Sequence, residues 1–110
     1  MKTSEAYIIP GLKTLDELVC QAFGITIEQL KAKDRKREGA DARKFVMWYR
    51  KNNSNLSLEK IGAMYTGRDH ATVFAAAKKF EELIETDKIF RQKCERALEL
   101  IEKQINMQNL

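Results

Sequence analysis

The stretch from Ser57 to Phe80, SLEKIGAMYTGRDHATVFAAAKKF, constrains the fold more than any other part of this sequence. Ser57 is a good N-cap for a first helix. Gly67 follows that helix at a turn where the backbone is expected to take a positive φ. A second helix is predicted by an apolar stripe at helical spacing, formed by Val73, Ala77, Phe80 and Ile84. The stretch therefore predicts two helices joined by a tight turn.

Polar side chains gather at the start of the second predicted helix, at Arg68, Asp69, His70 and Thr72. An arginine can donate to guanine, an aspartate can accept from cytosine, and the methyl group of Ala71 can contact thymine. This composition fits the first turn of a helix that enters the DNA major groove in a helix-turn-helix. The alternative is structural: Asp69 caps the helix, Arg68 pairs locally, and His70 and Thr72 are surface residues. Composition alone does not separate the two interpretations.

Positive charge is concentrated in the middle of the chain. The net charge of the 110 residues is +4, but residues 31–51 hold nine lysines and arginines against three acids. Such a segment attracts a polyanion, of which nucleic acid is the commonest. A solvated, lysine-rich face is an equally good explanation of the charge by itself.

The whole chain is predicted to be an all-α, compact bundle of about six helices. Capping-box patterns mark two helix starts, at Thr14 with Glu17 and at Thr26 with Gln29. The almost entirely charged segment 31–39 is expected to be an exposed connector, and a third helix is expected from about Asp41 to Asn52. We expect a poorly ordered leader at 1–11, a DNA-binding domain at 12–86 and an amphipathic C-terminal helix at 87–110.

The apolar stripe of the C-terminal helix needs a partner. Its members recur at spacings of three and four: Phe90, Cys94, Ala97 or Leu98, Ile101 and Ile105. We expect the stripe to pack back on the domain, because three heptads are few for a stable coiled-coil dimer. A monomer is therefore expected rather than a homodimer.

Little in the sequence points to an enzyme. His70 is the single histidine, and no serine or cysteine is placed beside it by the sequence. Residues 62–67 have the glycine spacing of a phosphate-binding loop, but Arg68 and Asp69 stand where lysine and a hydroxyl residue are needed. Cys20 and Cys94 fit no metal spacing and are interpreted as reduced core thiols. We expect no cofactor, no metal, no membrane span and a cytoplasmic location.

The sequence IGAMYTGRDHATVFAAAKKF resembles the signature of the C-terminal DNA-binding domain of the bacterial replication initiator DnaA, approximately I-G-x-x-F-G-G-R-D-H-T-T-V-x-x-A. Nine positions match: Ile61, Gly62, Gly67, Arg68, Asp69, His70, Thr72, Val73 and Ala76. Weaker similarity extends from about Leu15 to Ile84. The resemblance implies a Trp-repressor-like helix-turn-helix domain that binds short A·T-rich boxes in double-stranded DNA.

The resemblance also implies a role for each matching position. Bases in the major groove would be read by Asp69, His70 and Thr72, with Ala71 between them and Arg68 beside them at the backbone or a base. The minor groove would receive Arg35, flanked by Lys33 and Arg37, which agrees with an exposed basic connector and with the attraction of arginine to narrow grooves. Phosphates would be contacted by Arg43, Lys44 and, more weakly, Ser57.

Three departures from the signature leave the target sequence open. Ala71 replaces the first threonine, Thr66 replaces the first glycine, and Asp34 stands in a loop that tends to be basic. The ATPase domain of the family has no counterpart here, so the chain is either a stand-alone relative, for which an ATPase partner in trans is possible, or a fragment. Two other functions stay open: a transcriptional or mobile-element regulator, and a helical protein-interaction domain that has lost DNA binding.

Overall fold

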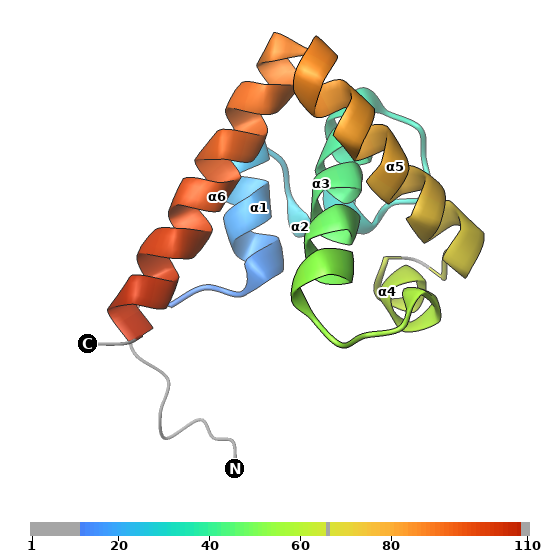
Figure 1. Cartoon of the computed structure of the whole chain (residues 1–110), viewed down its shortest axis with the longest axis horizontal. Helices are drawn as coiled ribbons and strands as arrows, with labels where there is room; N and C mark the ends of the chain where they lie inside the picture. The colour runs from blue at the N-terminus through green and yellow to red at the C-terminus, as the bar shows by residue number, and fades with distance from the viewer. Residues whose placement is uncertain (1–11, 66, 109–110) are drawn as a thin grey trace.

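A computed structural model describes residues 12–65 and 67–108, and within these ranges the chain forms six helices and no strand. The helices are α1 (Leu15–Phe23), α2 (Ile27–Lys31), α3 (Arg37–Asn53), α4 (Leu58–Met64), α5 (His70–Thr86) and α6 (Lys88–Gln108) (Figure 1). The all-α prediction is confirmed. The predicted leader at 1–11 and the departure at Thr66 lie outside the described residues.

Side-chain caps begin four of these helices where the sequence predicts them. The hydroxyls of Thr14 and Thr26 each accept from a backbone amide three residues later, at 3.1 Å, and the side chains of Glu17 and Gln29 accept in return at 2.8 Å. Ser57 caps α4 and Asp69 caps α5 in the same way. These hydrogen bonds satisfy amides that have no partner within the helix.

Helix α3 begins at Arg37, four residues before the predicted start at Asp41. The connector is therefore shorter than predicted, at residues 32–36. Lys36 makes no side-chain cap hydrogen bond, so the local sequence carries no capping signal for this start. Gly39 lies inside the first turns of α3 and is buried. A Cβ there would stand 2.6 Å from the carbonyl oxygen of Gln29. This glycine permits the close approach of α3 to α2 and does not end a loop.

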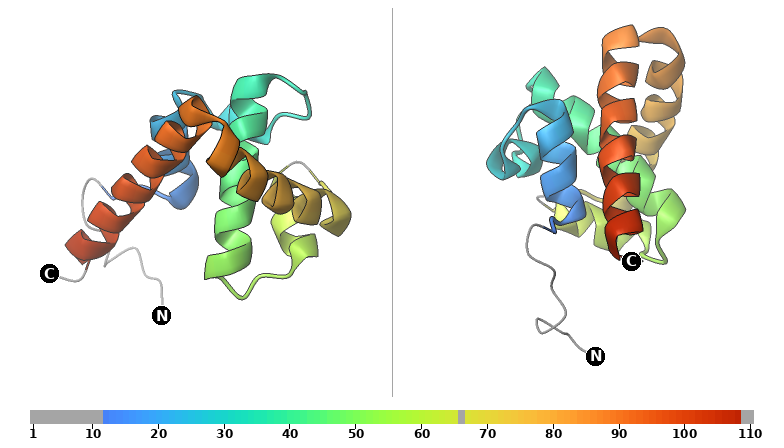
Figure 2. Two further views of the ribbon diagram at one scale, coloured as in Figure 1. Left: turned by 45° about the horizontal axis from the view of Figure 1, so that its top comes forward. Right: turned by 90° about the vertical axis from the view of Figure 1, so that its left-hand side faces the viewer.

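Two pairs of helices pack most extensively. Helix α1 lies along α6, and α3 lies along α5, with α4 beneath the start of α5 (Figures 1 and 2). Four phenylalanines meet between these pairs, with neighbouring ring centroids 5.7–6.3 Å apart. They come one each from α1, α3, α5 and α6: Phe23, Phe45, Phe80 and Phe90. This aromatic core packs against the buried face of α5, and the first turn of the helix stays at the surface.

The apolar stripe of α6 packs back on the domain, as predicted. Phe90, Cys94, Ala97 and Ile101 are buried, whereas Leu98 and Ile105 stay partly exposed. The amide of Lys13 donates to the Gln104 side chain at 2.9 Å, which ties the far end of α6 to the segment before α1. Cys20 and Cys94 are free and buried, and burial raises their thiol pKa values to about 11 and about 12. None of the helices in the described part of the chain is long and apolar enough to cross a membrane.

Candidate nucleic-acid interface

The turn between α4 and α5 is tight because two glycines permit it. Gly67 has a φ of +65°, in the left-handed region that glycine enters at little cost. Gly62 lies in α4 directly against the turn, and a Cβ there would stand 1.9 Å from the carbonyl oxygen of Arg68. The amide of Arg68 donates to the carbonyl oxygen of Gly62 at 3.0 Å. The start of α5 is thereby held at a defined position against α4.

The first turn of α5 projects into solvent. His70, Ala71 and Thr72 are exposed, while Val73 behind them is buried. Asp69 is exposed as well, but one of its carboxylate oxygens accepts the amide hydrogen of Thr72 at 2.8 Å. This hydrogen bond lowers the pKa of Asp69 below its usual value. Asp69 therefore has the capping role that the structural interpretation assigned to it, with Thr72 as its partner, and His70 and Ala71 lie exposed beside them.

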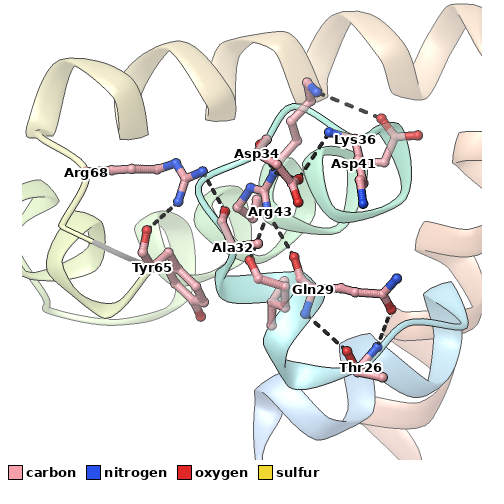
Figure 3. Close-up of polar contacts among 11 residues, drawn as sticks. Thr26, Gln29, Ala32, Asp34, Lys36, Asp41, Arg43, Tyr65 and Arg68 are labelled. Atoms are coloured by element: carbon pink, nitrogen blue, oxygen red, sulfur yellow. Dashed lines mark hydrogen bonds and ion pairs between the residues drawn. The ribbon is translucent and has the colours of Figure 1, made fainter.

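Arg68 does not project with this turn. Its side chain is partly buried and points back toward the loop after α2, where Nη2 donates to the carbonyl oxygen of Ala32 at 3.0 Å. Its other terminal nitrogen, Nη1, donates to the carbonyl oxygen of Tyr65 (Figure 3). In this structure Arg68 makes local contacts, as the structural interpretation expected.

Arg43 is placed differently from its prediction as a phosphate contact. Its side chain is buried, with the residue 4% exposed, and three hydrogen bonds of 2.9–3.1 Å run from its guanidinium to the carbonyl oxygens of Gln29, Leu30 and Asp34. Burial lowers its pKa, and the positive charge of Arg68 lowers it further. The phosphate contact of Arg43 stays a prediction, and in this structure its charged group points inward (Figure 3).

An open hollow joins the loop after α2 to the outer side of α5. Its walls come from the loop, from α3, from the α4–α5 turn and from the small side chains of Thr72, Ala75 and Ala76. Asp34 is the single acid among the lining residues, against six basic ones: Lys33, Arg35, Arg43, Lys44, Arg68 and Lys79. The predicted minor-groove arginine and the predicted recognition helix thus lie on two sides of one basic concavity.

The cations of this region differ in their availability. Lys33 and Arg35 are exposed on the loop. Arg37 instead forms ion pairs with Asp41, at 3.3 Å, and with Asp87. Lys44 lies 3.8 Å from Asp41, and burial lowers its pKa, as do the positive charges of neighbouring cations. Of the three residues predicted at the minor groove, Arg37 is therefore the one already held by carboxylates.

Two features of the region were not foreseen from the sequence. Asp34 accepts the amide hydrogen of Lys36 at 3.1 Å, so the acidic departure in the basic loop closes a local turn. Tyr65 is fully buried, and its hydroxyl donates to Asp16 at 2.6 Å and accepts from Arg50 at 2.7 Å. A tyrosine where the DnaA signature has phenylalanine was the available signal of this buried network.

Comparison with known proteins identifies the domain. A sequence model described as the bacterial dnaA protein helix-turn-helix matches residues 12–80. The chain belongs to this family. The DnaA C-terminal helix-turn-helix is a DNA-binding module and not a catalytic one. Within the described residues, no group of three or more histidine, cysteine or acidic side chains could hold a metal ion.

Several relatives share most of the chain. The chromosomal replication initiator protein DnaA of Thermodesulfovibrio yellowstonii is 41% identical over 76 residues, which cover 69% of this chain and 17% of that protein. The protein of the same name from Chlorobaculum tepidum is 37% identical over 91 residues, covering 83% of this chain and 18% of the relative. A third, from Porphyromonas gingivalis, is 36% identical over 90 residues, or 82% and 19%. The chain thus spans less than a fifth of the length of these relatives.

Proposed function

We propose that this DnaA-family domain binds double-stranded DNA sequence-specifically, with α5 in the major groove and the loop at residues 32–36 in the adjacent minor groove. The observation that carries the proposal is the shared basic hollow, which places Arg35 and the first turns of α5 on two sides of one concavity. A duplex backbone between the two elements would meet positive charge along its path. The target would be a short A·T-rich sequence similar to a DnaA box.

The major-groove contacts would come from the exposed first turn of α5. His70 offers an exposed hydrogen-bonding ring, Thr72 offers a hydroxyl beside the Asp69 carboxylate, and Ala71 offers a methyl group for thymine. Asp69 already caps the helix through one oxygen, so any base contact has to be made with the cap in place. Arg68 would have to break its hydrogen bonds to two carbonyl oxygens before it could reach a base, so we do not assign it a base contact.

The remaining contacts would be electrostatic. Arg35, with Lys33 beside it, is exposed and suits a narrow A·T-rich minor groove, whose negative potential attracts arginine. Lys44 in the hollow would contact phosphate, since an anion there would relieve the repulsion from neighbouring cations. Ser57 is a weaker candidate because its hydroxyl already accepts the amide hydrogen of Lys60.

The biological role would be replication initiation or its regulation, in the cytoplasm where the chromosome lies. The relatives are named chromosomal replication initiators, which supports this choice over a transcriptional or mobile-element regulator. The domain would act as a monomer, because the α6 stripe is largely used within the domain. An ATPase, in the same polypeptide or in trans, would be the natural partner.

The decisive experiment is selection of bound duplexes from a random library, followed by titration of the selected duplex and a scrambled one. The wild-type domain should prefer the selected duplex, and His70→Ala should reduce that preference by about 1–3 kcal/mol. Arg96→Ala is the matched control, because Arg96 is exposed on α6, far along the chain from the hollow. Equal affinity for both duplexes at near-physiological salt would contradict sequence-specific reading. Absence of binding even at low salt would favour the protein-interaction domain.

A further inference from the structure

We propose that Arg68 is a positioning residue that couples the minor-groove loop to the recognition helix, so that Arg35 and α5 present themselves to DNA as one rigid unit. This inference rests on the proposed function and adds a specificity-determining role to a residue whose position in the signature suggests a reader of bases. In the described structure the loop backbone is held by a small number of hydrogen bonds, among them that of Asp34 with the Lys36 amide.

The loop after α2 is ordered through its carbonyl oxygens. Helix α2 has only five residues, so the carbonyl groups at its end have no helical partners. Two guanidinium groups bind the carbonyl oxygens of this segment: Arg43 those of Gln29, Leu30 and Asp34, and Arg68 that of Ala32. Figure 3 shows both side chains reaching the inner side of the loop from two different elements.

Arg68 is the only one of these two that reaches the loop from the helix-turn-helix. Nη1 binds the carbonyl oxygen of Tyr65 in the α4–α5 turn, and the amide of Arg68 binds Gly62 in α4. Tyr65 is itself held by Asp16 of α1 and Arg50 of α3 through its hydroxyl. A continuous series of hydrogen bonds therefore runs from the core network, through Arg68, to the backbone next to Lys33.

The chemistry of the loop explains why such a bridge is needed. Lys33, Arg35 and Lys36 are exposed like charges close together in the loop, with Asp34 the one acid among them, and their repulsion favours an extended, variable loop. Ordering the loop before DNA arrives removes an entropic cost from the binding step. The planar guanidinium can serve two carbonyl oxygens in fixed directions, whereas a lysine ammonium at the same position cannot reproduce this fork. Positive charge at position 68 is therefore insufficient, and the bidentate shape is required.

The test compares Arg68→Lys, which keeps the charge, with the wild type, each with and without Arg35→Ala. In the wild type, Arg35→Ala should weaken binding to the selected duplex by about tenfold. In the Arg68→Lys background the same change should weaken it less than about twofold, because the loop no longer presents Arg35. His70→Ala should cost the same factor in both backgrounds.

A second measurement follows the free protein. Trypsin cuts after lysine and arginine, so cleavage after Lys33, Arg35 and Lys36 reports opening of the loop. Arg68→Lys and Arg68→Gln, which also removes the charge, should both speed these cuts at least about fivefold, at a temperature where circular dichroism shows the domain folded. Arg96→Lys is the control and should cut like the wild type, because Arg96 lies exposed on α6.

The outcomes separate the two proposals. A wild-type domain without duplex preference would overturn the proposed function and the positioning role together. Duplex preference with an undiminished Arg35→Ala effect and unchanged loop cleavage in Arg68→Lys would overturn the positioning role alone. Coupling of Arg68 to His70 in place of Arg35 would assign Arg68 to base reading, and would also overturn the proposal.

Discussion

Substitution of Arg43 by methionine should destabilise the domain without reducing its contacts to phosphate. Methionine replaces the aliphatic part of the arginine side chain, but it has no guanidinium and donates no hydrogen bond. Three carbonyl oxygens now paired at 2.9–3.1 Å would lose their donor. Because the guanidinium points inward, we expect Arg43→Met to lower the free energy of unfolding.

The burial of the three carbonyl groups sets the magnitude. The hydrogen bond to Leu30 is buried, so its carbonyl oxygen would stay without a partner at a cost of about 2 kcal/mol. The bonds to Gln29 and Asp34 are partly buried, and water can replace the lost donor at a cost of about 0.5 kcal/mol each. The total is about 3 kcal/mol. For a domain of this size, that corresponds to a melting temperature lower by about 12–24 °C.

Lys44→Ala provides the comparison, because Lys44 is the neighbouring residue and partly exposed. Its melting temperature should change little, but the slope of log affinity against log salt should fall by about 0.9, the contribution of one phosphate contact. For Arg43→Met, measured below its melting transition, the salt slope should stay at the wild-type value. A melting temperature within about 3 °C of wild type, together with a reduced salt slope, would refute the buried role of Arg43.

Three further substitutions test the turn and its supports. Gly62→Ala should lower the free energy of unfolding in urea by about 2–3 kcal/mol, because its Cβ would stand 1.9 Å from the Arg68 carbonyl oxygen; an unchanged urea midpoint would contradict this contact. Tyr65→Phe should cost about 1–2 kcal/mol at pH 7, since the hydrogen bond to Asp16 is lost. Burial raises the pKa of Tyr65 above 10.0, so its stabilising effect should be complete below pH 10 and should decline above it. In Tyr65→Phe the melting temperature should therefore depend less on pH across that range. Asp69→Asn keeps a capping acceptor, so the melting temperature should hold while duplex selection shows an altered preference; an unaltered preference would limit Asp69 to capping.

Helix starts were predictable where a capping side chain is present in the sequence. Thr14, Thr26, Ser57 and Asp69 all cap the helices that the local pattern predicts, because capping depends on residues three positions apart. The start of α3 was missed, since Lys36 makes no cap and this end of the helix is held by the packing of Gly39 against Gln29 and by the ion pair of Arg37 with Asp87. Local patterns therefore located most of the fold, and failed where packing alone decides a boundary.

The direction of a side chain was harder to predict than its position. Arg43 follows a basic loop and precedes Lys44, so nothing in the local sequence separates a phosphate contact from a buried anchor. The Tyr65 network joins Asp16, Arg50 and Tyr65 from three elements, and no local spacing relates residues so far apart in the chain. Such contacts exist only after the helices pack.

Some of the cations predicted to contact DNA are bound within the domain, and this should reduce the salt dependence of DNA binding. The sequence and the resemblance together assigned six cations to DNA: Lys33, Arg35, Arg37, Arg43, Lys44 and Arg68. In the structure Arg43 and Arg68 donate to backbone carbonyl oxygens, and Arg37 pairs with two carboxylates. Of the three that remain, Lys44 also lies 3.8 Å from Asp41, so together they would contribute at most about −2.7 to the salt slope, where six would contribute about −5.4. Shape and position, more than the amount of charge, would then give this domain its preference, because charge contacts bind every sequence alike while Arg43 and Arg68 would hold in place the few groups that read bases.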